Sequence, residues 1–364
     1  NTITSTTKIY VDAASGDDTN DGTSWGTAFA TLQQALSVAT GNDEIWIAAG
    51  TYTPGSNRGD SFRITGGQDG LEIYGGFAGT ETNRDERDPT ANPTILSGDL
   101  NGDDGPDTDG DGIPDSGRGE NAYHVLVFDG GDDIGPNVGP NVTTATVLDG
   151  VTVTGGNANG SDPQNEGGGL YCDGAGGGNA CSPTLRRIAF TGNAAGFGGA
   201  IYNNGLFGMS SPQITNATFT GNSANLGGAI YNNGVLGTSS PQITNATFTG
   251  NSANSGQGGA IYNGGLNGTS SPQITNTILW GNTAPDGPQV YNTGSGTTPT
   301  VAHSLLEGGL SSISENNGSS TTDGGNNLDA NPLFVDATDP DGTDDTPATA
   351  DDGLLLQPGS PAVD

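Results

Sequence analysis

The chain has 364 residues and a formal net charge of −33, from 41 acidic residues against 8 lysines and arginines. A surface of this charge repels nucleic acid, pectin-like acidic glycans and anionic membranes, because binding to those partners needs clustered cations. The 65 glycines recur between β-branched and aromatic residues, a composition that favours many short strands joined by tight turns. We therefore predict an all-β protein.

Residues 1–7, NTITSTT, form an N-terminal extension that is polar, β-prone and outside every repeat of the chain. Because the chain begins with Asn instead of Met, we expect that a secretory signal peptide has been removed and that the protein is secreted. We also predict that the extension adds as a donor strand to a neighbouring copy of the protein. The residues expected to make this contact are Asn1, Thr2, Ile3 and Thr4.

Residues 8–130 contain irregular β-rich runs such as KIYVDAASG and DEIWIAAGTY, each ended by glycine or another turn residue. The run TAFATLQQALSVAT is the one candidate for an amphipathic helix, and we expect it to cap an open apolar end of the fold. The apolar residues that share one face of this helix are Ala28, Leu32, Ala35, Leu36 and Ala39.

The acidic segment 99–115, DLNGDDGPDTDGDGIPD, has the spacing D-x-D-x-D-G-x-x-D from Asp107 to Asp115. A second, overlapping series of oxygen-bearing side chains at alternate positions begins at Asp99. Oxygen ligands at alternate positions, with glycine to permit a tight wrap, are what Ca²⁺ requires. The pattern resembles thrombospondin type-3 and EF-hand-like loops, although Arg118 stands where the twelfth-position acid is usual and Glu120 lies nearby. The alternative is a solvated acidic loop. The predicted calcium ligands are Asp99, Asn101, Asp103, Asp107, Asp109, Asp111 and Asp115.

Internal repetition in residues 131–310 determines the fold. The segments SPTLRRIAFTGN, SPQITNATFTGN (twice) and SPQITNTILWGN place prolines at 183, 212, 241 and 272, and GGAIYN follows each of the first three. A repeat of 29–31 residues with two or three short strands is one coil of a solenoid, because no single unit can bury its own apolar face. The absence of a 3.6-residue apolar period excludes helical solenoids.

Stacked coils should align equivalent side chains in columns along the axis of the solenoid. We therefore predict a right-handed single-stranded parallel β-helix with a short N-terminal capping helix. The predicted internal columns are Ile214, Ile243 and Ile274; Phe190, Phe219, Phe248 and Leu279; and Ile201, Ile230 and Ile261.

Two further features belong to the repeats. Cys172 and Cys181 flank the glycine-rich loop CDGAGGGNAC, whose turns can bring them together, and we predict a disulfide formed in an oxidising compartment. The alternative is two free thiols. The turns NNGLFGMSS and NNGVLGTSS project from successive coils, and their apolar tips are predicted to form a stripe for self-association unless they fold back onto their own coils. These tips are Leu206, Phe207, Val235 and Leu236.

Residues 311–364 return to acidic loops, with a final ordered piece at NPLFVD. Nowhere in the sequence does an apolar run approach the ~18 residues needed to span a bilayer, so we expect no direct membrane insertion.

The repeats also carry a family resemblance. FTGN followed by GGAI resembles the paired repeat of polymorphic outer-membrane-protein adhesins. The opening run from YVDAASGDD to DEIWIAAGTY, with the later TILSGDLNGDD, ENAYHVLVF and LLLQPGSPAVD, is similar to large bacterial β-helix surface proteins of the choice-of-anchor type. The resemblance implies a β-helix at the cell surface with a role in adhesion or surface structure.

The distribution of titratable residues argues against an enzyme. From Ile188 to Pro285 there is no Asp, Glu, Lys, Arg or His, so the most regular coils cannot host acid–base chemistry. His124 and His303 are expected to be structural. The basic residues, which show no evident clustering with acidic residues on a repeat strand, are Lys8, Arg58, Arg63, Arg84, Arg87, Arg118, Arg186 and Arg187.

Two functions follow from these features. The first is an extracellular structural or adhesive protein, stabilised by Ca²⁺ and self-assembling into filaments or a surface layer, with copies of itself or surface glycans as partners. The alternative is a secreted β-helix that binds or cleaves carbohydrate. Groove residues such as Asp129, Asp132 and Asp149 would serve this alternative.

Overall fold

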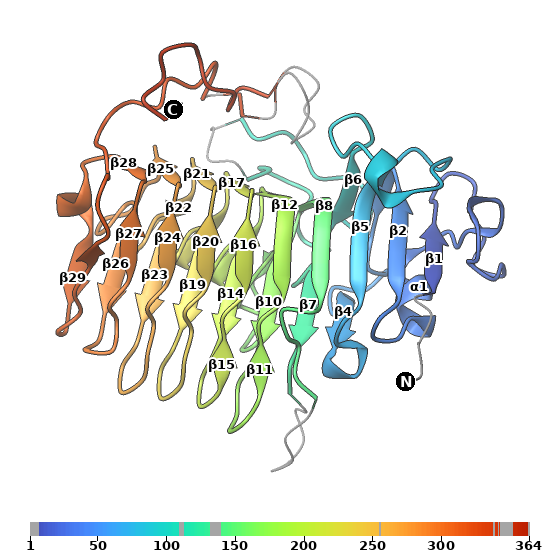
Figure 1. Cartoon of the computed structure of the whole chain (residues 1–364), viewed down its shortest axis with the longest axis horizontal. Coiled ribbons are helices and arrows are strands. Elements are labelled where there is room, and N and C mark those ends of the chain that lie inside the picture. The colour runs from blue at the N-terminus through green and yellow to red at the C-terminus, as the bar shows by residue number, and fades with distance from the viewer. Residues whose placement is uncertain are drawn as a thin grey trace.

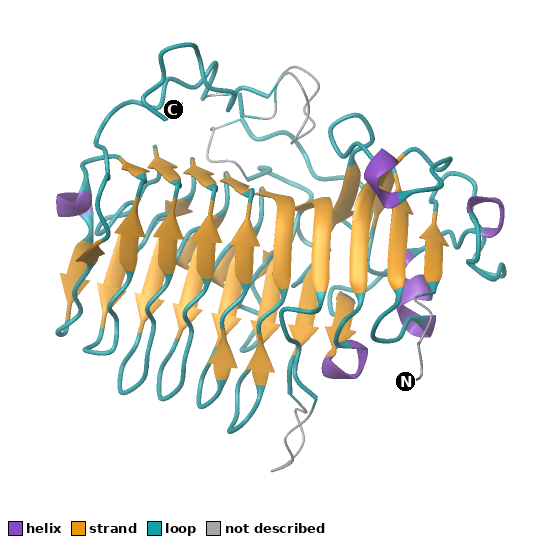
Figure 2. Ribbon diagram, in the orientation of Figure 1, coloured by secondary structure: helices purple, strands orange, loops and turns teal. Residues whose placement is uncertain are grey.

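The chain folds as an elongated right-handed parallel β-helix, in which strands of successive coils lie side by side from one end to the other (Figure 1). This confirms the predicted fold class. The structure, a computed structural model, describes residues 7–108, 113–131, 140–254, 256–337, 339–340, 342 and 352–362. Within these residues, regular structure is almost entirely strand, as Figure 2 shows, with one α-helix and four short 3₁₀ turns.

The largest sheet, called sheet A, has sixteen strands, and every pairing in it is parallel. Its main path runs through β1 (Lys8–Val11), β2 (Glu44–Ala48), β5 (Glu72–Phe77), β8 (Val147–Thr154), β12 (Thr184–Thr191), β16 (Gln213–Thr215), β20 (Gln242–Thr244), β24 (Gln273–Thr275), β27 (Thr300–Ala302) and β30 (Thr322–Asp323). The remaining strands are β3 (Gly50–Tyr52), β6 (Thr94–Ser97), β17 (Thr218–Thr220), β21 (Thr247–Thr249), β25 (Ile278–Trp280) and β28 (Leu305–Leu306).

A second sheet, called sheet B, has eight parallel strands. They are β4 (Phe62–Thr65), β7 (Leu126–Asp129), β10 (Leu170–Asp173), β14 (Ile201–Asn204), β19 (Ile230–Asn233), β23 (Ile261–Gly264), β26 (Val290–Thr293) and β29 (Ser314–Asn316). Two small sheets complete the coils: β9 (Asn157–Ala158), β13 (Ala194–Phe197), β18 (Ser223–Leu226) and β22 (Ser252–Ala253) in one, and β11 (Ala180–Cys181) and β15 (Met209–Ser210) in the other.

The predicted columns are confirmed by the strand register. Ile214 pairs with Ile243 and Ile243 with Ile274, and the phenylalanine and second isoleucine columns pair in the same way. All of these side chains are fully buried. The rings of Phe219 and Phe248 stack with centroids 4.4 Å apart. Stacking identical apolar side chains along the axis therefore builds one continuous core.

Buried asparagines also form ladders inside the coils. The Nδ2 group of Asn222 donates to Oδ1 of Asn251 at 2.9 Å, and Asn251 does the same to Asn282. A parallel ladder on sheet B joins Asn203, Asn232 and the asparagine of the next coil at 2.8 Å. Hydrogen bonding along the axis satisfies these amides, which would otherwise be costly to bury.

A left-handed backbone position recurs after the QIT strands. Asn216, Asn245 and Asn276 have φ of 53°, 54° and 50°, and His303 takes the same position in the next coil with φ of 51°. Asparagine tolerates this conformation better than most non-glycine residues, because its short polar side chain can hydrogen-bond locally.

The N-terminal helix is shorter than predicted. Helix α1 (Leu32–Val38) buries Leu32, Ala35 and Leu36, whereas Ala28 is extended and lies outside the helix. The helix begins where it does because the Thr31 side chain caps it by accepting a hydrogen bond from the backbone of Gln34 at 3.1 Å.

Sheet A runs without a break from β1 to β30, across the boundaries that the sequence suggested near residues 130 and 310. The C-terminal segment, red in Figure 1, leaves the last coil and returns along one side of the helix. None of the helices in the described residues combines the length and apolarity needed to cross a bilayer.

Candidate functional site

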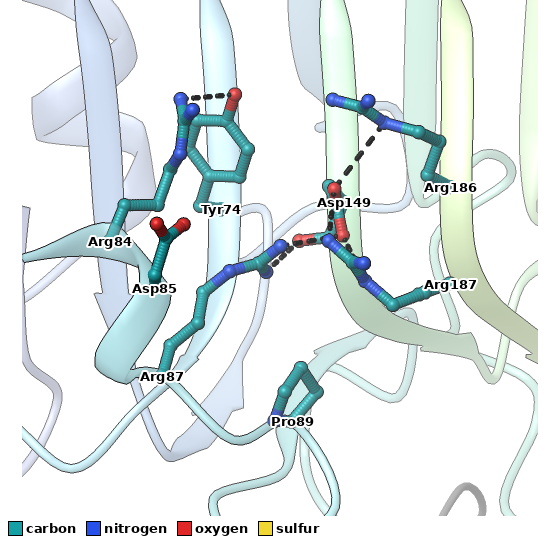
Figure 3. A pocket seen from close by; sticks show the side chains of 8 residues that line it. All are labelled: Tyr74, Arg84, Asp85, Arg87, Pro89, Asp149, Arg186 and Arg187. Carbon is teal, nitrogen blue, oxygen red and sulfur yellow. Dashed lines mark hydrogen bonds and ion pairs between the residues drawn. The ribbon is translucent and has the colours of Figure 1, made fainter.

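A cleft of about 350 Å³ lies on the outer face of sheet A, and four arginines line it (Figure 3). Tyr74 comes from β5, Asp149 from β8, and Arg186 with Arg187 from β12. The remaining lining residues belong to the segment between β5 and β6, which includes the 3₁₀ turn Arg84–Glu86. They are Arg84, Asp85, Arg87 and Pro89. We call this site the arginine cleft.

Strand register explains why residues far apart in sequence meet here. Tyr74 pairs with Asp149, and Asp149 pairs with Arg186, so the three side chains occupy one outward row on neighbouring coils. Gly150, with φ of 77°, leaves room for Arg87, because a Cβ at this position would lie 2.6 Å from Nη1 of Arg87.

Asp149 is the centre of the arginine cleft. Its side chain is 1% exposed and forms ion pairs with Arg87 at 2.9 Å and with Arg187 at 2.7 Å. Arg187 binds the carboxylate with both Nε and Nη2, and Nε of Arg186 lies 3.4 Å away. Three guanidinium groups therefore face one buried carboxylate, and even with Asp85 in the lining the cationic side chains outnumber the carboxylates.

The exposed arginines are the ones that a ligand could reach. The side chains of Arg186 and Arg187 are 42% and 51% exposed, whereas Arg87 is 7% exposed and anchored to the carbonyl of Gly75 at 2.9 Å. Nε of Arg186 is buried and makes no hydrogen bond within the described part of the chain. The buried Arg87 thus neutralises Asp149 from within the protein, while Arg186 and Arg187 present their guanidinium groups to solvent.

Tyr74 forms the opposite wall of the arginine cleft. Arg84 lies over its ring at 4.6 Å from the centroid and donates to its hydroxyl at 2.8 Å. Burial, followed by the hydrogen bond to Glu72, raises the pKa of Tyr74 well above its ordinary value. Because Arg84 is also ion-paired with Glu72 at 3.1 Å, its charge is largely balanced.

The two exposed arginines are departures from the repeat. Arg186 pairs with Thr215 of the next coil, and Arg187 occupies the left-handed position that Asn216 takes there, with φ of 49°. An arginine has no local hydrogen bond to offset this conformation, which costs of order 1–2 kcal/mol. Residues held in unfavourable backbone conformations cluster at functional sites.

Sequence reasoning missed the arginine cleft. The prediction that basic residues do not cluster with acidic residues on a repeat strand is wrong, because Arg186 and Arg187 both form ion pairs with Asp149. The usable signal was the substitution of LRR for ITN in an otherwise similar repeat. Arg84 and Arg87 carried no such signal, because they reach the site from an irregular segment.

The groove acids named from the sequence do not form one site. Asp149 lies beneath the arginines, whereas Asp129 lies on β7 of sheet B and is ion-paired with Arg63. Asp132 falls outside the described residues.

The predicted calcium loop contributes to a compact group of acids. Ligand atoms of Asp99, Asp103 and Glu120 all lie within 4.8 Å of one another. Asp115 instead turns into its own loop, where it accepts a hydrogen bond from the backbone of Thr108 at 3.1 Å, while Asn101 and Asp107 are exposed. Asp109 and Asp111 lie outside the described residues.

The oxygen atoms around this acidic group suit a hard cation. Oδ1 of Asp104, Oε1 of Glu120 and Oδ1 of Asn121 are buried and have no hydrogen-bond partner among the residues that the structure describes. Burial raises the pKa of Asp104, and burial together with Asp103 raises that of Glu120. An all-oxygen set with unpaired buried acceptors fits Ca²⁺, which would be held by Asp99, Asp103 and Glu120.

The other residues predicted from the sequence are the two cysteines, the loop tips and the N-terminal extension. Cys172 and Cys181 are buried and joined in a disulfide with a Cα–Cα distance of 5.7 Å. Phe207 and Leu236 are 58% and 46% exposed at the loop tips. The loops stack, since the backbone of Phe207 donates to Val235 at 3.4 Å, and Leu206 is half-buried. The extension at Asn1, Thr2, Ile3 and Thr4 lies outside the described residues.

Comparison with known proteins gives one partial family match. Residues 14–108 match the family model described as a protein of unknown function, DUF1565. The matched segment contains Tyr74, Arg84 and Arg87 of the arginine cleft but not Asp149, Arg186 or Arg187. No curated protein matches the chain.

Several solved structures are similar in fold. Pectate lyase Pel9A is similar over 98% of this chain and 91% of that chain, with 13% identity and a TM-score of 0.46. The GH136 lacto-N-biosidase from Eubacterium ramulus is similar over 87% and 55%, with 10% identity and a TM-score of 0.39. XylC, in complex with xylose, is similar over 86% and 68%, with 10% identity and a TM-score of 0.36. Likeness at this level carries no information on activity.

Proposed function

We propose that the protein is an extracellular β-helix that binds an anionic polysaccharide through the arginine cleft. One observation carries the proposal: a chain with a net charge of −33 gathers four of its eight basic residues around a single cleft. Burying Asp149 does not require three guanidinium groups, and Asp85 is the one other carboxylate in the lining, so the positive charge that remains favours an anionic partner. Negative net charge still opposes acidic glycans at long range, and the cleft acts only at short range.

The chemistry of the cleft favours carboxylate or sulfate groups. A guanidinium presents its donors in a planar fork that matches such anions, often through two parallel hydrogen bonds. Asp149 holds Arg186 and Arg187 in position, and both guanidinium groups remain partly exposed, so a bound anion can accept hydrogen bonds from their outward N–H groups. A uronate-containing polysaccharide supplies such a carboxylate on each of its uronate sugar units.

We propose binding, and not bond cleavage, at the arginine cleft. Proton transfer at neutral pH is most efficient with a group whose pKa lies near 7. The arginines keep their protons at neutral pH, and the raised pKa of Tyr74 keeps its hydroxyl protonated as well. Asp149 is buried and ion-paired.

The test replaces the two exposed arginines by the residues of the next coil, in the double variant Arg186→Thr, Arg187→Asn. Calorimetric titration with polygalacturonate is expected to show at least a tenfold loss of affinity, because each charge-assisted hydrogen bond contributes ~1.5–3 kcal/mol. Lys8→Gln, which removes a charge on β1, is the matched control and should bind normally. Equal binding by the double variant, or equal binding of the carboxyl-reduced polymer, would refute the proposal.

Secretion and a surface role are part of the same proposal. They rest on the resemblance of the FTGN and GGAI repeats to surface adhesins and on the disulfide, which suits an oxidising compartment. Self-association remains a second proposal, favoured by the exposed tips Phe207 and Leu236 in an uncharged stretch of coils. Analytical ultracentrifugation of Phe207→Asn, Leu236→Asn tests it: an unchanged sedimentation profile would remove these tips from any assembly.

Calcium binding is proposed at the acidic group instead of at the full predicted loop. The candidate ligands are Asp99, Asp103 and Glu120, supported by the unpaired oxygens of Asp104 and Asn121. The ion would neutralise carboxylates that otherwise repel one another and so would order this segment beside the core.

A further inference from the structure

A groove of about 620 Å³ lies over the later coils of sheet A, beyond the arginine cleft. Four successive coils form its floor, and Pro361 and Ala362 of the C-terminal segment form one wall. The floor residues used below are Asn245, Asn276, Ile278, His303, Leu305 and Leu328. We call this site the asparagine groove.

A polar row runs along one side of the asparagine groove. Strands β20, β24 and β27 pair in register, so the residues that directly follow them share one column. These residues are Asn245, Asn276 and His303, all exposed and all in the left-handed conformation. Asn245 donates to Oδ1 of Asn216 at 3.1 Å, whereas the side-chain amide of Asn276 has no hydrogen-bond partner within the described part of the chain. The amide of Asn276 is therefore available to a ligand.

An apolar row lies beside the polar row, two residues further along each coil. Ile278 pairs with Thr247 of the preceding coil and with Leu305 of the next, and Leu305 in turn forms a bridge with Leu328. The coil before Thr247 also has threonine here, at Thr218, so the change to apolar side chains is a departure from the repeat. Leu328 is 46% exposed and Ile278 is half-buried. The groove thus offers hydrogen-bonding groups along one side and hydrocarbon along the other.

The chemistry of these two rows favours an uncharged ligand rich in hydroxyl groups. Among the residues that the structure places in the lining, none is Asp, Glu, Lys or Arg, so an ion would lose water without gaining a partner of opposite charge. Side-chain amides both donate and accept hydrogen bonds, as sugar hydroxyl groups do. The apolar row can cover the C–H groups of a sugar ring. Neutral sugar units therefore fit both rows.

The polar row continues into the arginine cleft. Strand β12 pairs with β16 and β16 with β20, so Arg187 and Asn216 precede Asn245 in the same column, and all three have left-handed backbones. Neighbouring coils are ~4.8 Å apart, which places Arg187 ~10 Å from Asn245 and ~14 Å from Asn276 along the axis. A single sugar ring cannot span this separation, but a short glycan chain lying along the axis can. Successive units of a polymer would then meet successive coils.

We propose that the asparagine groove binds neutral sugar units of the polysaccharide whose acidic units the arginine cleft holds. The glycan lies along the axis of the solenoid, with a uronate at Arg186 and Arg187 and neutral units over Asn245 and Asn276. This inference rests on the proposed function of the arginine cleft. It narrows the ligand from any uronate polymer to one that contains both acidic and neutral units.

The test compares mixed polysaccharides with a purely acidic one, by calorimetric titration of the full chain. The mixed polymers are glucuronoxylan, rhamnogalacturonan and a glucuronate-bearing arabinogalactan, and the purely acidic one is polygalacturonate. The variant Asn245→Gly, Asn276→Gly removes two amides, and glycine accepts the left-handed backbone of both positions. It should weaken binding of at least one mixed polymer by roughly five- to a hundredfold, with polygalacturonate binding changed by less than about twofold, because two neutral hydrogen bonds are lost.

Three results would overturn the inference. They are no binding of any mixed polymer by the wild type, wild-type affinity of Asn245→Gly, Asn276→Gly for every mixed polymer, and an equal loss of affinity for polygalacturonate. Asn267→Gly is the matched control, because Asn267 is exposed with φ of 54° but lies at a loop tip outside the groove, and it should bind every polymer normally. Thermal denaturation verifies that the variants are folded.

The two sites fail independently in this design. Polygalacturonate binding that survives in Arg186→Thr, Arg187→Asn refutes the proposed function of the arginine cleft. Mixed-polymer binding that survives in Asn245→Gly, Asn276→Gly refutes the asparagine groove alone.

Discussion

The coils after Ile188 and those before it share one backbone plan but differ in chemistry. From Ile188 to Pro285 the repeats carry no charged side chain, and their columns of isoleucine, phenylalanine and asparagine continue almost without interruption. In the earlier coils the outward columns of threonine and asparagine hold Arg186, Arg187 and Asp173 instead. The arginine cleft therefore lies where charged residues interrupt a neutral ladder.

This difference suggests a division of roles within one solenoid. Each coil contacts only its neighbours, so a regular stack supplies stability by repetition. The less regular coils carry insertions, such as the segment from Arg84 to Pro89, that fold over the outer face and build walls around the columns. Regularity therefore provides the scaffold, and departures from regularity provide candidate sites.

The largest expected effect is on the regular coils. Phe219→Ala removes a fully buried ring from the middle of its stack and should lower the free energy of unfolding by about 3–5 kcal/mol. Urea denaturation measures the change. Phe207→Ala is the matched control, because that ring is 58% exposed, and should stay within about 0.5 kcal/mol of wild type. Similar losses in both variants would contradict a core built from the ladders.

A second effect concerns Glu166, which precedes β10 in the irregular coils and whose pKa is raised to about 7 chiefly by burial. A carboxyl with a raised pKa in the folded state stabilises the fold at low pH, and this stability is lost as pH rises from the ordinary value towards about 7. Between pH 4 and pH 8 the wild type should lose at most about 3 kcal/mol relative to Glu166→Gln. Urea denaturation at both pH values tests this. Parallel pH curves for the two proteins would show that Glu166 is not perturbed.

Calcium should stabilise the irregular coils by a similar amount. A ligand that binds only the folded state at a hundred times its Kd contributes about 2.7 kcal/mol, so EDTA should lower Tm. The variant Asp103→Asn, Glu120→Gln removes two candidate ligands and should lose the response to EDTA. A wild-type Tm that is indifferent to both CaCl₂ and EDTA would exclude the site.

The smallest expected effect is on stability at the arginine cleft. Arg186→Thr, Arg187→Asn leaves Asp149 paired with Arg87 and places asparagine in a left-handed position that suits it. Gains and losses should nearly cancel, with a change within about 1 kcal/mol. A loss above about 3 kcal/mol in thermal or urea denaturation would instead make these arginines structural partners of Asp149.

Much of the fold could be predicted from the sequence because the repeats encode it. Prolines at fixed spacing set the register, and the isoleucine and phenylalanine columns follow from it. The limits of the helix could not be predicted from its apolar face alone, because the Thr31 cap ends the extended segment that contains Ala28.

The candidate sites were less predictable, because they depend on contacts between segments distant in sequence. Arg87 meets Asp149 across 62 positions, and Glu120 joins Asp99 from outside the predicted loop. The strongly negative net charge of the chain also gave no indication that four arginines gather around one cleft. The substitution of Arg186 and Arg187 for the threonine and asparagine of the repeat was visible, and departures from an internal repeat are therefore worth examining as site markers.

The most direct test of the arginine cleft is a crystal structure of the protein with a bound oligogalacturonate. We expect a sugar carboxylate within hydrogen-bonding distance of the guanidinium groups of Arg186 and Arg187. An oligosaccharide bound elsewhere with those groups still facing solvent, or no bound sugar at a saturating concentration, would contradict it.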